Sequence, residues 1–157
     1  MNIKTYKAIK SSRNVHYIDI ENVCGSGELT ASMVAEARQR YFTQIQPGKD
    51  DLFFVAASHH NMIAVCFGWP GAHHQFRSGK DGADIELASD IVYEHPQDLY
   101  RSAYVASGDG GLAPFVAYLV QHSLPVTVVI GVGCASSEFL QTGASIVQLR
   151  REVDLAA

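Results

Sequence analysis

Three aspartates stand where an apolar run of the sequence gives way to a turn or a helix. Asp19 lies in "HYIDIEN", Asp84 in "GADIELASDI" and Asp109 in "YVASGDGGLAPF". Carboxylates that meet in one place repel one another, which is costly unless a cation holds them together. Their oxygens suit Mg²⁺ or Mn²⁺, and such an ion can bind phosphate oxygens and activate water to hydrolyse a phosphodiester.

Each aspartate also has an ordinary structural explanation. Asp19 can cap the loop after its strand, Asp84 can begin a helix, and Asp109 can form a turn between glycines. These alternatives stay open for each residue taken singly. The three aspartates predict a site only if the fold brings them to one place.

The helical stretch 82–95 predicts an orientation for Asp84. On a helical wheel, Asp84 falls near the middle of an apolar arc formed by Ile85, Leu87, Ala88, Ile91 and Val92. Glu86 and Asp90 fall on the opposite side of the wheel. We therefore expect Asp84 to point inward, toward the sheet, and Glu86 and Asp90 to be solvated.

The elements that must position these residues alternate between two patterns along the chain. Strands are expected at 15–20, 51–57, 74–77, 102–106, 125–131 and 145–149. Helices are expected at 32–45, 58–66, 82–95, 112–122 and 136–142. This alternation predicts an α/β fold, a three-layer α/β/α sandwich with a mostly parallel, Rossmann-like central sheet. Ligands of such sheets bind beyond the carboxyl ends of the strands, where we expect the three aspartates to meet.

Length and composition limit the classes of protein to consider. The chain has 157 residues, of which 47% are apolar and 18% charged, and this predicts a single folded domain over 1–157. Residues 1–13 are expected to be a short N-terminal tail or edge segment. No apolar run approaches the roughly 20 residues of a membrane span, so we expect no membrane partner.

Charge and cysteine content narrow the expected location and partners further. The N-terminus lacks the apolar core of a signal peptide, and Cys24, Cys66 and Cys134 have no CxxC spacing. These features favour reduced thiols in a cytoplasmic protein over a disulfide framework or a zinc site. The formal charge of −4 counts against a broad surface for non-specific DNA binding.

Four segments carry a pattern known from a protein family. They are "YIDIEN" (17–22), "GADIELASDI" (82–91), "VASGDGGLAPFVAYL" (105–119) and "SSEFLQTGASIVQL" (136–149). In their order and spacing, over nearly the whole chain, they resemble the NYN domain family of the PIN-like nuclease superfamily. The resemblance implies a PIN-like α/β/α sandwich with an acidic pocket at the carboxyl edge of its sheet. It also implies metal-dependent cleavage of RNA, with Mg²⁺ or Mn²⁺ as the cofactor.

The resemblance assigns roles to single residues. Asp19 matches the family's first metal-binding acid, and Asn22 the polar partner in its D-x-x-N motif. Asp84 matches the second acid, from G-x-D, and Asp109 the third, from S-G-D. On this basis Asp19, Asp84 and Asp109 are the expected metal ligands and catalytic residues, and Asn22 is expected to orient a ligand or a water.

Further residues are expected near the substrate. Ser107 and Gly108 match the turn that presents the third acid, and we expect this turn to contact substrate. Arg77 and Lys80 lie in the loop before Asp84, where they can meet phosphates or be solvated.

One position departs from the family pattern. Family members often read S-G-D-x-D-F, whereas this chain has Gly111 at the place of the second aspartate. Asp90 matches an acid seen further along the same helix in many relatives, although the wheel puts it on the outer face. Three carboxylates can suffice, Glu21 can compensate, or the pocket can hold RNA without cutting it.

The sequence therefore predicts a metal-dependent ribonuclease. The alternative from a different class is a weak or inactive module that binds RNA or a nucleotide in the same pocket. A phosphatase-like or flavodoxin-like domain with Asp19 as nucleophile ranks last, because Glu21 stands where a D-x-D motif needs aspartate. "GVGCAS" at 131–136 lacks the third glycine of a dinucleotide loop, so no nicotinamide or flavin cofactor is expected. The sequence leaves a homo-oligomer open.

Overall fold

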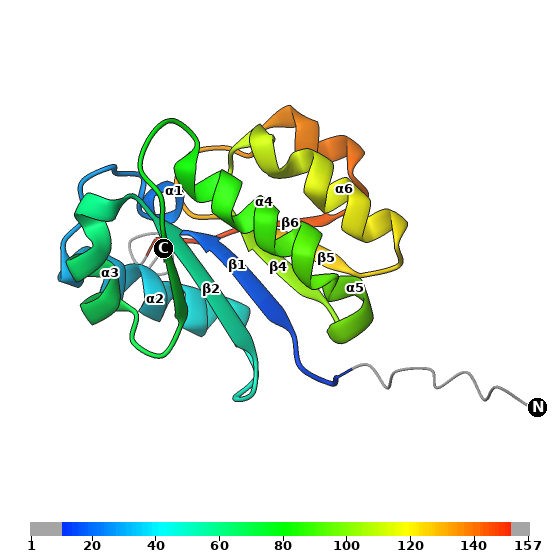
Figure 1. The fold of residues 1–157 in the computed structure, drawn as a ribbon, viewed down its shortest axis with the longest axis horizontal. Coiled ribbons are helices and arrows are strands. Elements are labelled where there is room, and N and C mark those ends of the chain that lie inside the picture. The colour runs from blue at the N-terminus through cyan, green and yellow to red at the C-terminus, as the bar shows by residue number, and fades with distance from the viewer. Residues whose placement is uncertain (1–10, 152–157) are drawn as a thin grey trace, which may run out of the picture.

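The structure, a computed structural model that describes residues 11–151, contains one six-stranded sheet with helices on both faces (Figure 1). The strands are β1 (Val15–Asp19), β2 (Leu52–Ala57), β3 (His73–Phe76), β4 (Ala103–Ala106), β5 (Val126–Ile130) and β6 (Ser145–Gln148). Neighbouring strands all pair parallel, in the order β3-β2-β1-β4-β5-β6. The predicted α/β sandwich is confirmed, with a sheet that is parallel throughout the described part of the chain.

The helices are α1 (Ile20–Cys24), α2 (Ala31–Ile45), α3 (Met62–Gly68), α4 (Gly82–Glu94), α5 (Pro96–Leu99) and α6 (Ala113–Gln121). The described residues also form three 3-10 helices: η1 (His59–Asn61), η2 (Gly110–Leu112) and η3 (Ser137–Gln141). The short helix expected at 58–66 is present as the 3-10 helix η1 followed directly by α3, which continues to Gly68. The helix expected at 136–142 is the 3-10 helix η3.

Short elements explain the remaining differences from the predicted pattern. The helices α1 and α5 have five and four residues, too few to show a helical period in the sequence.

No helix in the described part of the chain is long and apolar enough to cross a membrane. Of the expected N-terminal tail, residues 1–10 lie outside the described residues.

Alternation along β1 separates two apolar cores, one on each face of the sheet. Tyr17 packs in the core under α4 and α6, whose buried residues include Leu87 and Val116. Ile18 packs in the other core, with Val34 of α2 and Trp69 just beyond α3. The sheet is thus covered by α4, α5 and α6 on the face toward the viewer in Figure 1 and by α2 and α3 on the other.

The order of the strands creates a crevice at the carboxyl edge of the sheet. From β1 the chain first builds outward through β2 and β3, and then returns to place β4 on the other side of β1. The helices that follow β1 and β4 therefore diverge to opposite faces, which leaves an opening beyond these two strand ends. Asp19 is the last residue of β1 and lies one residue beyond its last pair with β4, Ile18 with Ala106.

The helix α4 is rotated relative to the predicted wheel. Asp84 is buried as expected, but Ile85 and Val92 are exposed. The prediction that Asp90 is solvated is wrong, because it is half-buried with one carboxylate oxygen out of contact with solvent. Burial raises the pKa of Asp90, and Gln75 of β3 partly opposes this through a hydrogen bond. The physical reason is that α4 crosses the sheet over β2, β1 and β3, so that the flank bearing Asp90 is covered.

Candidate functional site

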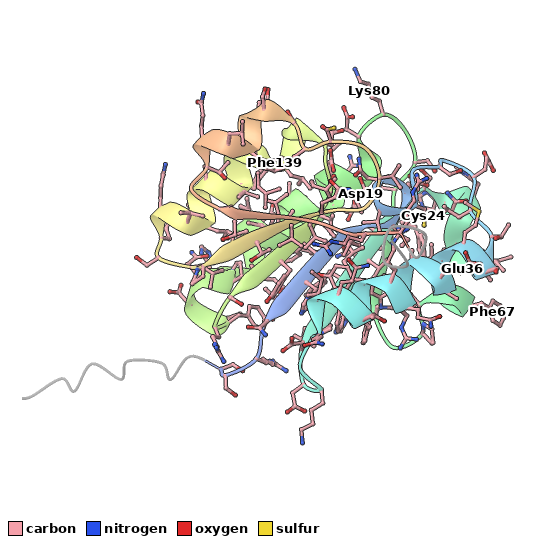
Figure 2. All side chains as sticks on the ribbon, turned by 180° about the vertical axis from the view of Figure 1, so that it is seen from behind. Asp19, Cys24, Glu36, Phe67, Lys80 and Phe139 are labelled. Carbon is pink, nitrogen blue, oxygen red and sulfur yellow. The ribbon has the colours of Figure 1, made fainter. Side chains whose placement is uncertain are left out.

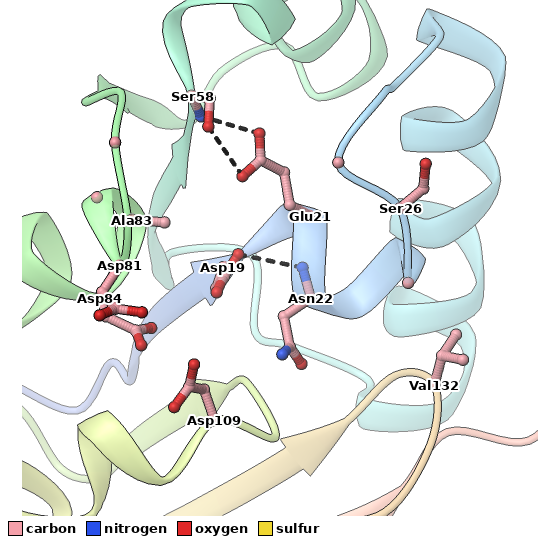
Figure 3. Close-up of a pocket in the computed structure, with 14 residues that line it drawn as sticks. Asp19, Glu21, Asn22, Ser26, Ser58, Asp81, Ala83, Asp84, Asp109 and Val132 are labelled. Carbon is pink, nitrogen blue, oxygen red and sulfur yellow. Dashed lines mark hydrogen bonds between the residues drawn. The ribbon is translucent and has the colours of Figure 1, made fainter.

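A pocket of about 430 Å³ opens at the carboxyl edge of the sheet, between α1, the start of α4 and the loop after β4 (Figure 3). Five acidic residues line it: Asp19, Glu21, Asp81, Asp84 and Asp109. No lysine, arginine or histidine lines it among the residues that the structure describes. The strand order thus brings together acids that are far apart in the sequence.

Asp19 links the end of β1 to the start of α1. As the N-cap of α1, it accepts a hydrogen bond at Oδ1 from the backbone N–H of Asn22, at 3.1 Å. Its buried carboxyl group has a pKa raised to about 6, chiefly by burial and then by the charges of Glu21 and Asp109. Asp19 thus caps the helix and also lines the pocket, so its capping role is confirmed and its chemical role stays a prediction.

Asp84 lies in the first turn of α4, and its side chain is directed into the pocket (Figure 3). The residue is 7% exposed, and its buried Oδ1 has no hydrogen-bond partner among the described residues. Burial, followed by the charges of Asp19, Asp109 and Asp81, raises the pKa of Asp84 to about 7. A buried carboxylate oxygen without a donor is expensive, and a cation is the partner that best relieves it.

The tightest cluster contains an acid that the sequence analysis does not single out. One oxygen each of Asp81, Asp84 and Asp109 lies within 4.8 Å of the others. Asp81 therefore stands in this cluster where Asp19 was expected, whereas Asp19 lines the same pocket beside it. Helical spacing could not have indicated Asp81, because it precedes the first residue of α4 and has a left-handed backbone.

The backbone before α4 explains why Asp81 reaches the cluster. Asp81 has a left-handed conformation with φ of 58°, and its side chain makes no capping hydrogen bond to the helix. The next residue must be glycine, because a Cβ on Gly82 would lie 2.2 Å from the carbonyl oxygen of Arg77. This sharp turn directs the carboxylate of Asp81 toward Asp84 instead of leaving it as a cap.

Asn22, Ser107 and Gly108 hold the loop that carries Asp109. The side-chain oxygen of Asn22 accepts from the backbone N–H of Gly108 at 2.8 Å. The hydroxyl oxygen of Ser107 accepts from the N–H of Asp109 at 3.2 Å, and Ser107 is 0% exposed. The expected contact of Ser107 with substrate does not fit this burial. The Ser107 side chain positions Asp109 instead.

Asp109 caps the turn that follows it. Its Oδ1 accepts from the N–H of Gly111 at 2.9 Å, and one oxygen of Asp109 belongs to the carboxylate cluster. A Cβ on Gly111 would lie 3.2 Å from Oδ2 of Asp84 and 3.4 Å from Oδ1 of Asp109. A side chain at position 111 would therefore enter the carboxylate cluster, at the place where the family pattern has another acid.

Glu21 is committed to a structural role, although it lines the pocket. Its carboxylate accepts from the N–H of Ser58 at 3.0 Å and from the Ser58 hydroxyl at 3.1 Å (Figure 3). It also accepts from the side-chain amide of Asn61 at 2.5 Å. These bonds tie α1 to the loop after β2. The expectation that Glu21 can replace the acid missing at Gly111 does not fit this arrangement.

Arg77 and Lys80 lie in the loop between β3 and α4 but do not line the pocket. Arg77 is exposed and pairs with Glu86 at 3.3 Å. Lys80 is exposed and projects from the tip of the loop, away from the body of the molecule (Figure 2). The loop contributes Gly79 and Asp81 to the pocket instead. The orientation of the two cations agrees with the solvated alternative.

Comparisons with known proteins support the fold. No known family model matches the chain, and no curated protein matches it. The chain is similar in structure to a protein of unknown function from Vibrio parahaemolyticus RIMD 2210633, known from a crystal structure. The TM-score is 0.60 at 17% sequence identity, over 90% of this chain and 97% of that one. The chain therefore has a Rossmann-like α/β/α fold built on a parallel sheet, which that solved structure shares.

Proposed function

We propose that this protein is a metal-dependent ribonuclease that hydrolyses RNA phosphodiester bonds at the aspartate cluster, as its resemblance to the NYN domain family implies. One observation carries the proposal: oxygens of Asp81, Asp84 and Asp109 lie within 4.8 Å of one another, and no cationic side chain of residues 11–151 lines their pocket. Asp81 and Asp109 are exposed and Asp84 is buried, so the repulsion penalises Asp84 most, and a divalent cation such as Mg²⁺ or Mn²⁺ would relieve it.

The donor set fits a hard cation that keeps open positions. Asp81, Asp84 and Asp109 would hold the ion, and the pocket oxygen of Asp19 would contact it directly or through water. When bound, such an ion polarises a phosphate and lowers the pKa of water, which supplies a nucleophile at neutral pH. A cation would stabilise Asp84 most, because its buried Oδ1 has no hydrogen-bond partner in the part of the chain that the structure describes.

The negative charge of the pocket also supports a metal-dependent site. An RNA phosphate brought to a pocket lined by five acids would be repelled, and the chain as a whole carries a formal charge of −4. Neither Arg77 nor Lys80 lines the pocket to offset this repulsion. Binding of RNA at this site therefore requires a cation between the carboxylates and the phosphate.

Replacement of a ligand tests the proposal. Asp109→Asn keeps the shape of the side chain and should lower Mn²⁺-dependent cleavage of a single-stranded RNA by about 100-fold or more, because it removes a carboxylate from the site. Asp50→Asn, in an exposed turn remote from the pocket, is the matched control. Unchanged cleavage by a folded Asp109→Asn protein would overturn the assignment.

A specific observation also favours a second candidate, an RNA-binding or nucleotide-binding module that does not cut. Gly111 contributes no carboxylate to the cluster, and the oxygens of Glu21 are occupied by Ser58 and Asn61. Binding of RNA in the presence of Mn²⁺, without cleavage of any RNA tested, would support this candidate over the nuclease.

A further inference from the structure

A second hollow adjoins the acidic pocket. It has a volume of about 460 Å³ and lies between α4 and the start of α6, which run side by side in Figure 1. Asp81, Asp84 and Asp109 line both hollows, so that the second one opens directly from the aspartate cluster. We call it the α4–α6 groove.

The walls of the α4–α6 groove are mainly apolar and aromatic. They are formed by Ile85, Val92 and Tyr93 of α4 and by Phe115 of α6. Tyr93 is 82% exposed, and Ile85 and Val92 are exposed as well. The hydroxyl of Ser89, which also lines the groove, already donates to the carbonyl of Ile85 at 2.8 Å. The groove therefore offers contact area and aromatic surface but few free hydrogen-bond donors.

These properties restrict the ligand. A ligand that fits presents a flat apolar face to the aromatic walls and is joined to a group that the aspartate cluster, with its proposed metal ion, would hold. A nucleobase joined through ribose to a phosphate has both features. Apart from the hydroxyl of Tyr93, the side chains that line the groove carry no free hydrogen-bond donor for a base edge, whereas stacking is available to every base.

Gly111 lies where the two hollows meet. It lines the groove, and a Cβ there would lie 3.2 Å from Oδ2 of Asp84. The absence of a side chain keeps the passage from the cluster to the groove open. The departure from the family pattern at this position thus coincides with access to the groove.

We propose that the α4–α6 groove binds a nucleobase of the RNA strand, adjacent to the phosphate held at the aspartate cluster, by stacking on Tyr93 and Phe115 without selecting among the bases. This inference rests on the proposed function and adds a substrate-positioning surface to it. Tyr93 and Phe115 position the strand and are not catalytic residues.

Truncation of an exposed aromatic residue tests the groove without endangering the fold. Tyr93→Ala should raise KM for a short single-stranded RNA by about 5- to 20-fold, the lower part of the range for loss of a stacked base, with kcat changed less than about twofold. Phe67→Ala is the matched control, because Phe67 is 76% exposed on α3, on the other face of the sheet (Figure 2). It should leave both constants unchanged.

An abasic scan of the RNA distinguishes base stacking on Tyr93 from a purely structural role of this residue. In the native protein, one abasic nucleotide next to the cleaved phosphate should raise KM by a similar factor. In Tyr93→Ala the same abasic nucleotide should have little further effect, because the two changes remove one shared contact. Equal sensitivity of the native and Tyr93→Ala proteins at every position would overturn the proposal.

The outcomes separate failure of the groove from failure of the nuclease. If RNA is cleaved normally by Tyr93→Ala, the groove proposal fails and the proposed function stands. If the native protein binds RNA with Mn²⁺ but does not cut it, the Kd values of the native and Tyr93→Ala proteins are compared instead. A loss of affinity in Tyr93→Ala would then support base binding in the groove but not the nuclease. If the native protein neither binds nor cuts RNA, both proposals fail. A changed oligomeric state in Tyr93→Ala with unchanged RNA affinity would make the groove a protein interface.

Discussion

The arrangement of the carboxylates predicts that Asp84→Asn stabilises the metal-free protein while it weakens the response to metal. Asp84 is 7% exposed, its Oδ1 has no hydrogen-bond partner within residues 11–151, and three other aspartates lie near it. Its ionised form is therefore penalised in the folded state. Asparagine has nearly the same shape but carries no charge, so that the penalty disappears without leaving a cavity.

The sign and size of the effect follow from the pKa of Asp84. Burial first, and then the neighbouring acids, raise this pKa from 3.8 to about 7 in the folded protein. Below pH 4 the carboxyl is protonated in both the folded and unfolded states and contributes nothing. Between about pH 4 and 7 only the unfolded state ionises, so stability falls as pH rises. Three pKa units set a ceiling of about 4 kcal/mol, and we expect about 2 kcal/mol because the open pocket admits water.

Urea unfolding in EDTA, from pH 4 to pH 8, measures this difference. Asp84→Asn should match the native protein near pH 4 and exceed its free energy of unfolding by about 2 kcal/mol at pH 8. Addition of Mn²⁺ at 100 times its Kd should raise the stability of the native protein by about 2.7 kcal/mol, and that of Asp84→Asn by much less. Asp50→Asn, in the exposed turn, should show neither effect.

Two results would refute the reasoning. A metal-free Asp84→Asn protein that is less stable than the native one at pH 8 would mean that the carboxylate is not destabilising. An equal gain from Mn²⁺ in both proteins would mean that Asp84 does not bind the metal.

Two further predictions concern side chains that position others. Asp51 accepts hydrogen bonds from the backbone N–H and side-chain amide of Asn14 and from the buried ring of His16, so Asp51→Asn should lower the free energy of unfolding by about 2–3 kcal/mol in urea. A loss below about 0.5 kcal/mol would show that these bonds contribute little. Asn22→Ala removes the acceptor for the N–H of Gly108 and should reduce kcat of RNA cleavage about tenfold, with KM nearly unchanged. A change confined to KM would instead place Asn22 in contact with substrate.

Much of the site could be predicted from the sequence, because the end of a strand is indicated by residues that are adjacent in the chain. Apolar runs that end at Asp19 and just before Asp109 are visible in the sequence, and the rule that parallel strands share a carboxyl edge brings the two ends together. The helical wheel also placed Asp84 correctly on the buried side of α4. The chemical role of these three residues stays a prediction.

Other features could not be predicted, because they depend on contacts between segments distant in the sequence. The partners of Glu21 are Ser58 and Asn61, and nothing in the sequence around Glu21 indicates these bonds. The direction of Asp81 depends on a left-handed turn that is imposed by the close approach of Gly82 to the backbone of Arg77. Both facts change the composition of the candidate site.

Period and polarity along the chain specify strands, helices and their buried sides, so the α/β sandwich and the edge of the sheet at which the acids gather could be predicted. Which acids form the tight cluster, and which flank of α4 is covered, depends on packing between distant segments. That flank depends on where the helix crosses the sheet: Asp90 lies over β3, whereas Ile85 and Val92 are left open to the α4–α6 groove. A helical wheel gives the direction of each side chain around one helix. It carries no information about which neighbouring elements lie in each direction.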